Sequence, residues 1–562
     1  MRIVVRLLVF TVALGLPIAF LHGSQRTIRA TRSVAVQLLT FNDFHGNLEP
    51  PSGADGQINA IVAGGAEYLA THLANAIARN PNSIVVAAGD VIGASPFVSS
   101  LFHDEPTIEA MNAMRLAVSS VGNHEFDEGP AELLRMKRGG CHPHDGCQDG
   151  DGFTGATFQY LSANVIRTTT RAPLFPATAV RTVGGVTIGF IGETLQGTPR
   201  IVSPAGTKGL TFLDEAATAN AHAARLKRQG VHAIVLLIHQ GGRQRPVEGN
   251  PDPNGCANFS GAIDPILDKL SPDIQVVIAG HSHVFYNCRI GNRLITSAGS
   301  YGRMFTRVTL DIDTATDQIT SASAVNEIVT RDVAKDPTQT RIVQKYWRLA
   351  EGSANKVVGA VTADLKRAPN GAGESAVGDV VADAMLAATS TSQTGGAVVA
   401  FMNSGGIRAD IVASARPTTP AGNVTYRALF AVQPFGNVVT VVTLTGEMIK
   451  RLLEQQFDNP RAGAASILQV SSGFTYRYRM NAPAGQHVDV DSISIDGRPI
   501  AAADRLRVAT LDFLVEGGGG YPALGDGTDK LVGIADIDAL VAFFRTRSPI
   551  APPAQNRIVR ID

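Results

Sequence analysis

Apolar runs in the first half of the chain alternate with polar loops and amphipathic stretches. From Ala35 onward, each run is rich in β-branched or other apolar residues and ends in a loop that contains Gly, Asp, Asn or His. The runs are VAVQLLTF, SIVVAAGD, AVSSVGNHEF, VTIGFIGE, AIVLLIHQ and IQVVIAGHS. Helical stretches such as Glu67–Ala78 lie between some of them. This pattern predicts an α/β fold with buried strands, in which ligands bind at the carboxyl ends of the strands.

A charged segment separates this pattern from a second series of strand signals. Charge density rises over Arg331–Ser353, which has a helix-like stretch with the only tryptophan, Trp347. We expect a connector helix within residues 331–355, acting either as a hinge or as a rigid interdomain helix. The expected division is a leader in residues 1–33, a first domain in 34–330 and a second domain in 356–562.

The first residues have the pattern of an export signal. In Met1–Leu21, Arg2 and Arg6 precede a mostly apolar run that is short for a membrane-spanning helix. No clear Ala-x-Ala site follows, so retention as an uncleaved anchor is the alternative to cleavage. We expect an exported protein (periplasmic, cell-surface or secreted) with no membrane contact beyond this leader.

The four cysteines suit an oxidising compartment. They allow three pairings, of which we expect the one that joins sequence neighbours, Cys141–Cys147 with Cys256–Cys288; free buried thiols are the alternative. Three potential metal ligands lie inside the first pair: His142, His144 and Asp145. They indicate a further metal site or, as we expect, only a Gly-rich surface insertion closed by a disulfide.

Length and charge exclude several classes of protein. The chain has 562 residues, too many for one small module, and its 44% hydrophobic content with zero net charge excludes intrinsic disorder. Lys plus Arg equals Asp plus Glu at 49 each, so the excess positive charge used in non-specific nucleic-acid binding is absent. We expect no nucleic-acid partner, and an anionic substrate would need a local source of positive charge.

Potential metal ligands gather where the predicted strands end. They lie in Asp43-Phe44-His45, Gly89-Asp90, Gly122-Asn123-His124-Glu125, Gly280-His281-Ser282-His283, and at His239. One such motif alone is commonly structural, whereas the whole set, each member after an apolar run, is hard to explain by chance. Carboxylate, amide and imidazole ligands together favour Zn, Mn, Fe or Co over Mg or Ca, which prefer all-oxygen shells.

The sequence resembles the secreted 5′-nucleotidase, UDP-sugar hydrolase and cyclic phosphodiesterase family of the calcineurin-like metallophosphoesterase superfamily. The resemblance runs through LLTFNDFHGNLEP, GDVIGASPFVSSLF, EAMN, VGNHEFDEG, SANV, GHSH and YGRMFTRVTL, and continues in the second half. It implies an N-terminal four-layer α/β/β/α metallophosphoesterase domain, a connector helix and a C-terminal α/β 5′-nucleotidase domain.

The resemblance also implies a centre with two divalent ions. One ion would be held by Asp43, His45, Asp90 and His283, and the other by Asp90, Asn123, His239 and His281, with Asp90 bridging. Such a pair stabilises both the attacking and the leaving oxygen of an in-line displacement. His124 would face the phosphate and stabilise the transition state. Asp127 would orient His124 through its other nitrogen; an ordinary helix-start carboxylate is the alternative.

Several motifs of the second half resemble the family's C-terminal domain. They are Glu374–Asp379, Asn403–Arg408, Gln433–Asn437, Asp512–Phe513 and Gly517–Tyr521. Arg408, in a Gly-rich loop with Asn403 and Gly406, is the best local anion binder. By the resemblance, Phe435 and Phe513 would sandwich a nucleobase. Asn437 and Gly473 would also contact the substrate; for a phenylalanine taken alone, a core position is the alternative.

Two positions depart from the family pattern. Gly519 stands where the family commonly has an aspartate that holds the ribose hydroxyls. The arginine expected just before Glu374 is absent, and Arg367 lies seven residues upstream of Glu374. The set of residues expected for the hydrolytic centre is complete, whereas two of the residues expected to contact the substrate are missing.

The sequence therefore predicts an exported dinuclear-metal phosphohydrolase, a 5′-nucleotidase that hydrolyses nucleoside monophosphates such as AMP by metal-activated water attack. Alternatives are a 2′,3′-cyclic nucleotide phosphodiesterase, a UDP-sugar hydrolase or an enzyme for non-nucleotide phosphomonoesters. An alternative of another class is an exported protein that binds metal or nucleotide without turnover. The expected partner is a small phosphate ester.

Overall fold

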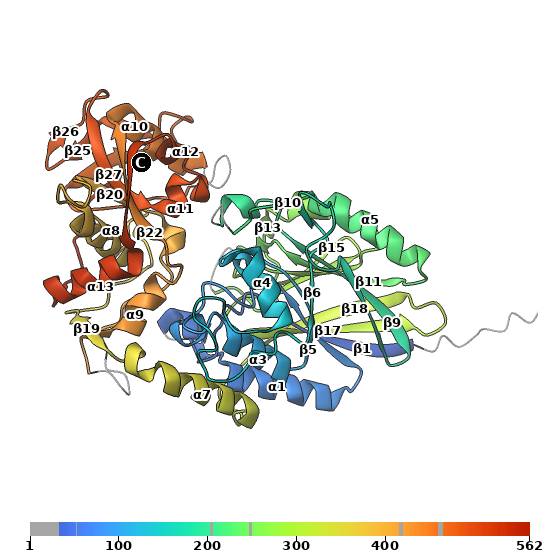
Figure 1. The fold of residues 1–562 in the computed structure, drawn as a ribbon. Coiled ribbons are helices and arrows are strands. Elements are labelled where there is room, and N and C mark those ends of the chain that lie inside the picture. Colours follow the sequence, from blue (N-terminus) through green and yellow to red (C-terminus); the bar gives the residue numbers. More distant parts are fainter. Residues whose placement is uncertain (1–32, 52, 203–205, 247–249, 415–419, 459–464) are drawn as a thin grey trace, which may run out of the picture.

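The computed structural model describes residues 33–51, 53–202, 206–246, 250–414, 420–458 and 465–562. The expected leader, residues 1–33, lies outside the described residues apart from Ser33, the first residue of β1. Figure 1 shows two bodies, the first coloured blue to yellow-green and the second gold to red, with helix α7 (Pro337–Ala354) leading from one to the other.

The first body contains two six-stranded sheets. The order of the first is β18-β17-β1-β4-β5-β6 and that of the second is β15-β16-β14-β11-β9-β8. The first is built from β1 (Ser33–Phe41), β4 (Ser83–Ala88), β5 (Leu116–Ser120), β6 (Gln159–Leu161), β17 (Met304–Asp313) and β18 (Ile319–Ile328). The second is built from β8 (Thr178–Val183), β9 (Val186–Thr194), β11 (Ala233–His239), β14 (Val276–Ala279), β15 (Phe285–Ile290) and β16 (Arg293–Ala298).

The central strands of each sheet are parallel, which brings their carboxyl ends to one edge. In the first sheet, β1 pairs with β4 with Leu38 beside Ile84, and β4 pairs with β5. In the second, β11 lies between β9 and β14, parallel to both. Strands that are parallel and buried on both faces explain the continuous apolar runs of the sequence.

Alternate side chains of the same strands build three apolar layers. Leu38 of β1 and Phe190 of β9 belong to the cluster between the two sheets. Leu39 of β1 points the other way and packs with α1 (Ala66–Arg79), α3 (Glu105–Ala113) and α4 (Gly129–Arg138). Leu236 of β11 packs with α5 (Glu215–Arg228) and α6 (Asp264–Leu267) on the far face. The four-layer α/β/β/α fold is confirmed.

Helix α7 is attached to the first body. It begins at Pro337, later than expected from the charge pattern, because Asp336 caps it by accepting the backbone N–H of Thr338 and Gln339. Gln339 donates to the carbonyl of Ala110 at 2.9 Å. Tyr346 is buried, with its ring 4.9 Å from that of Phe102. These contacts attach the helix to the first body.

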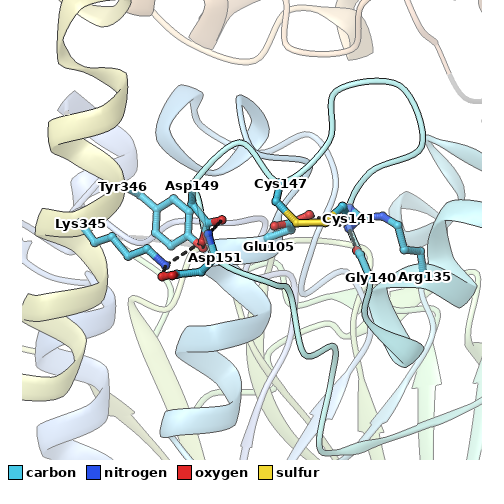
Figure 2. The surroundings of a disulfide bond; sticks show 9 residues. All are labelled: Glu105, Arg135, Gly140, Cys141, Cys147, Asp149, Asp151, Lys345 and Tyr346. Atoms are coloured by element: carbon cyan, nitrogen blue, oxygen red, sulfur yellow. Dashed lines mark hydrogen bonds and ion pairs between the residues drawn. A yellow bond between two sulfur atoms is a disulfide. The ribbon is translucent and has the colours of Figure 1, made fainter.

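A loop insertion after α4 also reaches α7. Both expected disulfides, Cys141–Cys147 and Cys256–Cys288, are formed, and the first closes the insertion. Figure 2 shows Asp149, just after Cys147, accepting hydrogen bonds from Lys345 at 2.7 Å and Tyr346 at 3.0 Å. The insertion is therefore held against the connector helix.

The second body combines two sheets with four longer helices. The five-stranded sheet has the order β23-β20-β27-β22-β28 and the four-stranded sheet the order β26-β25-β24-β29. Their strands are β20 (Val399–Met402), β22 (Val438–Thr445), β23 (Gln469–Val470), β24 (Phe474–Tyr478), β25 (Val488–Ile495), β26 (Arg498–Pro499), β27 (Arg505–Leu511), β28 (Thr528–Ala535) and β29 (Ile558–Arg560). The helices are α8 (Ala376–Thr389), α9 (Tyr426–Val432), α10 (Gly446–Gln455) and α13 (Asp536–Arg547). One apolar core joins these elements.

Short elements complete the described chain. They are β2 (Gln57–Ile58), β3 (Ile61–Val62), β7 (Val165–Arg167), β10 (Leu210–Phe212), β12 (Gly242–Arg243), β13 (Ser260–Gly261), β19 (Val357–Ala360), β21 (Asn423–Thr425), α2 (Phe97–Ser100), α11 (Asp512–Val515) and α12 (Pro522–Gly525). Within the described ranges, no helix combines the length and the apolar character needed to cross a bilayer.

Candidate active site

The seven expected metal ligands follow the carboxyl ends of five strands. β1 leads to Asp43 and His45, β4 to Asp90, β5 to Asn123, β11 ends at His239, and β14 leads to His281 and His283. Because these strands run parallel within each sheet, residues far apart in the sequence meet at one edge of the sandwich. This edge holds the candidate active site.

Two carboxylates lie among the histidines. His239 Nε2 is 2.8 Å from Asp90 Oδ2, and His283 Nε2 is 3.2 Å from Asp43 Oδ1. His45 Nε2 lies between the two carboxylates, 3.8 Å from Asp43 Oδ1 and 3.7 Å from Asp90 Oδ2. The side chains of Asp43, Asp90, His45 and His239 are at most 1% exposed, whereas His283 keeps 28% exposed. The cluster is buried on one side and open on the other.

Backbone carbonyls orient two of the imidazoles. His45 Nδ1 donates to the carbonyl of Gly93 at 2.8 Å, and His239 Nδ1 donates to that of Ala88 at 2.7 Å. In the neutral rings the lone pair is then on Nε2, which faces carboxylate oxygens in both cases. Asn123 Oδ1 is buried and accepts no hydrogen bond from the described residues.

Lone pairs that converge on carboxylates repel one another unless a proton or a metal ion lies between them. The carbonyl-bonded nitrogens are the outer partners that fix the ring orientation of metal-binding histidines. The donor set combines imidazole, carboxylate and amide oxygen, which fits divalent transition metals such as Zn, Mn, Co or Fe. The chemistry and the geometry of these residues therefore fit a metal centre.

The electrostatics keep the carboxylates ionised. Burial alone would raise the pKa of Asp43, but His283 and His239 outweigh this effect and hold that pKa well below its ordinary value. Burial alone would lower the pKa of His239, but the charges of Asp90 and Asp43 raise it to about 10. A site with two ionised buried carboxylates strongly attracts positive charge.

The ligand loops have unusual backbone conformations. Asp43, His45, Asp90 and His283 have φ of 49°, 47°, 50° and 55°, in the left-handed region that side chains other than glycine seldom adopt. Gly122 faces Asp90 so closely that any side chain there would collide with the carboxylate. Strain of this kind is retained mainly at functional sites.

His124 stands beside the cluster and is oriented by Asp127. Its Nδ1 donates to Asp127 Oδ2 at 2.8 Å, so Nε2 is the nitrogen available to a substrate. Its backbone N–H donates to Asp90 Oδ1 at 2.9 Å, and its ring lies 5.0 Å from that of His45. His124 keeps 14% of its side chain exposed. The contact between His124 and Asp127 has the geometry that the sequence predicted.

The second body touches this edge through Phe435 and Arg408. The Phe435 ring stacks on that of His124 with centroids 5.6 Å apart and an angle of 21° between the planes. The guanidinium carbon of Arg408 lies 5.6 Å from the centroid of Phe435. In the same Gly-rich loop, Gly406 is buried and Asn403 Oδ1 is a buried acceptor without a hydrogen bond in the described structure. These four expected substrate-binding residues thus share one region.

Other expected substrate-binding residues lie in different surroundings. Asn437 donates to Asp536 Oδ2 at 3.4 Å. Gly473 sits in a turn whose carbonyl accepts the backbone N–H of Asp496. Phe513, on α11, packs partly buried on the second core, and no ring contact in the described chain joins it to Phe435.

One cavity of the described structure lies between the bodies next to Tyr301 and Arg408, and a second lies within the second body. The larger, of about 590 Å³, lies between the bodies and is lined by residues that include Asn47, Tyr301, Trp347 and Arg408. The smaller, of about 220 Å³, is lined by residues that include Arg367, Ser375 and Ser404. Arg367 also approaches Asp55 of the first body at 3.3 Å. The larger cavity has the size of a small-molecule site.

The sequence reasoning missed three residues that support the ligands. Glu125 accepts the backbone N–H groups of Asp90, at 2.9 Å, and of Gly122, at 2.5 Å. Asn42 donates to Asp43 Oδ2 at 2.6 Å, and Tyr301 donates its backbone N–H to the carbonyl of Asp43 at 2.7 Å. All three residues belong to quoted motifs, Tyr301 as the first residue of YGRMFTRVTL, but no sequence pattern assigned them a role.

Comparison with known families and proteins agrees with this arrangement. A family model described as calcineurin-like phosphoesterase matches residues 36–285. A second, described as the C-terminal domain of 5′-nucleotidase, matches residues 355–526. The two matches correspond to the two bodies of the fold.

Similar proteins extend over nearly the whole chain. It is 33% identical to the endonuclease YhcR of Bacillus subtilis over 93% of this chain, but spans only 41% of that protein. It is also 33% identical to the cell wall protein Lmo0130 of Listeria monocytogenes, over 92% of this chain and 67% of that protein. The structure of a 5′-nucleotidase precursor from Thermus thermophilus superimposes with a TM-score of 0.75 at 24% identity, covering 94% of this chain and 100% of that one. The chain belongs to the 5′-nucleotidase family of calcineurin-like phosphoesterases, a family of metal-dependent phosphoester hydrolases.

Proposed function

We propose that the protein is an exported 5′-nucleotidase with a dinuclear metal centre, which releases phosphate from nucleoside monophosphates such as AMP. The observation that carries this proposal is the buried cluster of Asp43, His45, Asp90, His239 and His283, with the His281 ring 5.4 Å from that of His239. His124 lies beside this cluster, and Phe435 stacks on His124 from the second body. Asp90, which lies near both His45 and His239, is the proposed bridging ligand. One ion would also use Asp43, His45 and His283, and the other Asn123, His239 and His281.

The chain's own residues have distinct proposed roles in hydrolysis. When bound, two divalent ions supply Lewis acidity to the phosphoryl group and activate the attacking water. His124 offers Nε2 to a phosphoryl or leaving-group oxygen while Asp127 holds its tautomer. Arg408 supplies the fixed positive charge that the neutral overall composition lacks.

The second body is proposed to select the substrate. Phe435 and Phe513 would hold a base by stacking, while Asn403, Gly406, Asn437 and Gly473 would contribute polar or backbone contacts. Gly519 in place of an aspartate favours a second candidate, a hydrolase for cyclic nucleotides, UDP-sugars or ribose-free phosphate esters.

A substrate panel separates these candidates. Purified protein reconstituted with Mn, Co or Zn is expected to hydrolyse AMP with a higher kcat/KM than 2′,3′-cyclic AMP, a UDP-sugar or glycerol phosphate. A higher kcat/KM with glycerol phosphate would refute the nucleotidase assignment. As an internal check, Gly519→Asp should improve kcat/KM for AMP and leave glycerol phosphate unchanged if this loop meets the ribose.

Replacement of Arg408 tests the proposed anion contact. We expect Arg408→Ala to lower kcat/KM for AMP roughly 10- to 100-fold, because a hydrogen bond to a charged group contributes on the order of 1.5–3 kcal/mol. Arg451→Ala is the control, since Arg451 pairs with Asp526 on the exposed surface. Equal kinetics for the two variants would remove Arg408 from the substrate site.

Export and the domain boundaries are part of the proposal. The similarity to a cell wall protein and to a 5′-nucleotidase precursor supports export. We assign residues 34–330 to the metal domain, 331–355 to the connector and 356–562 to the substrate domain, which agrees with the two separate apolar cores.

A further inference from the structure

A second group of potential metal ligands lies on the first body, outside the candidate active site. His103 lies in the turn before α3, Glu128 and Glu132 lie at the start of α4, and His142 lies in the insertion closed by Cys141–Cys147. One ligand atom from each of these four side chains lies within 4.8 Å of the others. Three segments that are separate in the sequence therefore bring two imidazoles and two carboxylates to one point.

Asp145 orients both histidines. The rings of His103 and His142 stack, with centroids 3.7 Å apart and an angle of 14° between them. Asp145 Oδ2 lies 2.8 Å from His103 Nε2 and 3.3 Å from His142 Nδ1. A single carboxylate oxygen thus lies beside one nitrogen of each ring. The backbone N–H of Asp145 also donates to His142 Nδ1 at 3.2 Å. At His103, the carboxylate of Asp145 has the position of a common outer partner of a metal-binding histidine.

The other nitrogen of His103 faces the remaining ligands. His103 Nδ1 makes a hydrogen bond with Glu128 Oε2 at 2.8 Å, and a metal ion at about 2.0–2.2 Å from each atom would replace this bond. Arg135 binds Glu132 through Nε at 3.0 and 2.9 Å, which fixes this carboxylate. A carboxylate has about four acceptor positions, so Glu132 can bind Arg135 and a metal together.

The insertion is held in place before any ion binds. Arg135 donates to the carbonyl of Gly140 at 2.7 Å and to Glu105 at 2.5 Å (Figure 2). On the other side of the disulfide, Lys345 of α7 is 2.7 Å from Asp149. A loop fixed at both ends presents His142 without a large loss of conformational freedom, which favours metal binding.

We propose that His103, Glu128, Glu132 and His142 form a third metal site, separate from the dinuclear centre, for a divalent transition metal such as Zn²⁺. Two imidazole nitrogens and two carboxylate oxygens suit Zn²⁺ or Mn²⁺ better than Ca²⁺ or Mg²⁺. Bound metal would join the insertion to Glu128, the neighbour of Asp127. The site is structural, and it would stabilise the segment from which His124 and Asp127 project.

Metal content measured by mass spectrometry after dialysis against buffered Zn²⁺ tests the proposal. We expect His142→Ala to bind about one equivalent less than the wild-type chain. His144→Ala is the matched control, because His144 lies in the same disulfide loop, outside the four ligands, and should keep the wild-type content. Equal metal content in the wild type and His142→Ala overturns the proposal.

A thermal measurement keeps the proposal testable if metal analysis is affected by folding. Melting curves recorded with EDTA show whether each variant folds, and His142→Gln or His103→Gln replaces an alanine variant that does not. Addition of Zn²⁺ should raise the Tm of His144→Ala more than that of His142→Ala, because only the control retains the third site. An equal rise in both variants overturns the proposal, even if the dinuclear centre is intact.

Discussion

His124→Ala is expected to lower kcat for AMP by about 10²- to 10⁴-fold while leaving the metal content unchanged. One ring nitrogen of His124 lies within 4.8 Å of ligand atoms of His45 and Asp90, but Nδ1 is committed to Asp127 and we assign Nε2 to the substrate. Its removal therefore takes away a proton donor or charge stabiliser without opening the ligand shell. Steady-state kinetics together with metal analysis of the same preparation measure both quantities.

Two further variants distinguish chemistry from packing. Because Phe435 stacks on His124, His124→Ala also removes a contact between the two bodies. Phe435→Ala removes the same stacking partner but keeps the imidazole, so it should act mainly on KM. Asp127→Asn should give an intermediate loss of kcat, since the ring remains but its tautomer is less well held. Full activity of His124→Ala would contradict the proposed mechanism.

Asp90→Asn is expected to reduce both metal content and turnover. Asp90 Oδ2 lies 2.8 Å from His239 Nε2 and 3.7 Å from His45 Nε2, so its carboxylate serves both halves of the centre. Loss of an outer partner alone weakens metal binding by roughly 10- to 100-fold, and loss of a shared ligand should exceed that. We expect metal titrations to show that the variant binds its second ion more than roughly 100-fold more weakly than the wild type does. Activity should fall in parallel.

Asp379→Asn provides the matched control for this prediction. Asp379 is fully buried in the second body. Burial raises the pKa of this carboxyl to about 8; the charge of Glu374 adds to the rise, and the charge of Arg557 opposes it. Its amide variant changes a buried aspartate without touching the proposed metal ligands. Metal binding and turnover should stay near wild type. A wild-type metal titration for Asp90→Asn would show that Asp90 does not bridge the ions.

Much of the first body could be predicted because its strands and the polar residues that follow them are visible as short patterns of neighbouring residues in the sequence. Continuous apolar runs identified the central strands, and polar residues directly after them identified ligands such as Asp43, Asp90 and His239. Parallel strands must end at a common edge, so the ligand cluster followed from the order of the motifs. The disulfide pairing was also predicted, since neighbouring cysteines were the simplest of three choices.

Other features depended on which surfaces meet in space. The sequence marks Phe435 and Arg408 only as members of motifs, and their position against His124 arises from the packing of two separately built cores. His103 carries no motif and pairs with His142 because the turn before α3, the start of α4 and the insertion converge.

The sequence by itself predicted the fold of the metal domain and, through its family resemblance, a set of candidate metal ligands and the kind of ions that this set suits. Only the tertiary structure decided that the connector helix contacts the first body and that Phe435, with Arg408 beside it, stacks on His124. It also brought together the second histidine cluster. The physical reason is that a strand and the candidate ligands after it form a pattern of only a few neighbouring residues. Contacts between distant segments depend instead on the shapes of the packed surfaces, which no short pattern encodes.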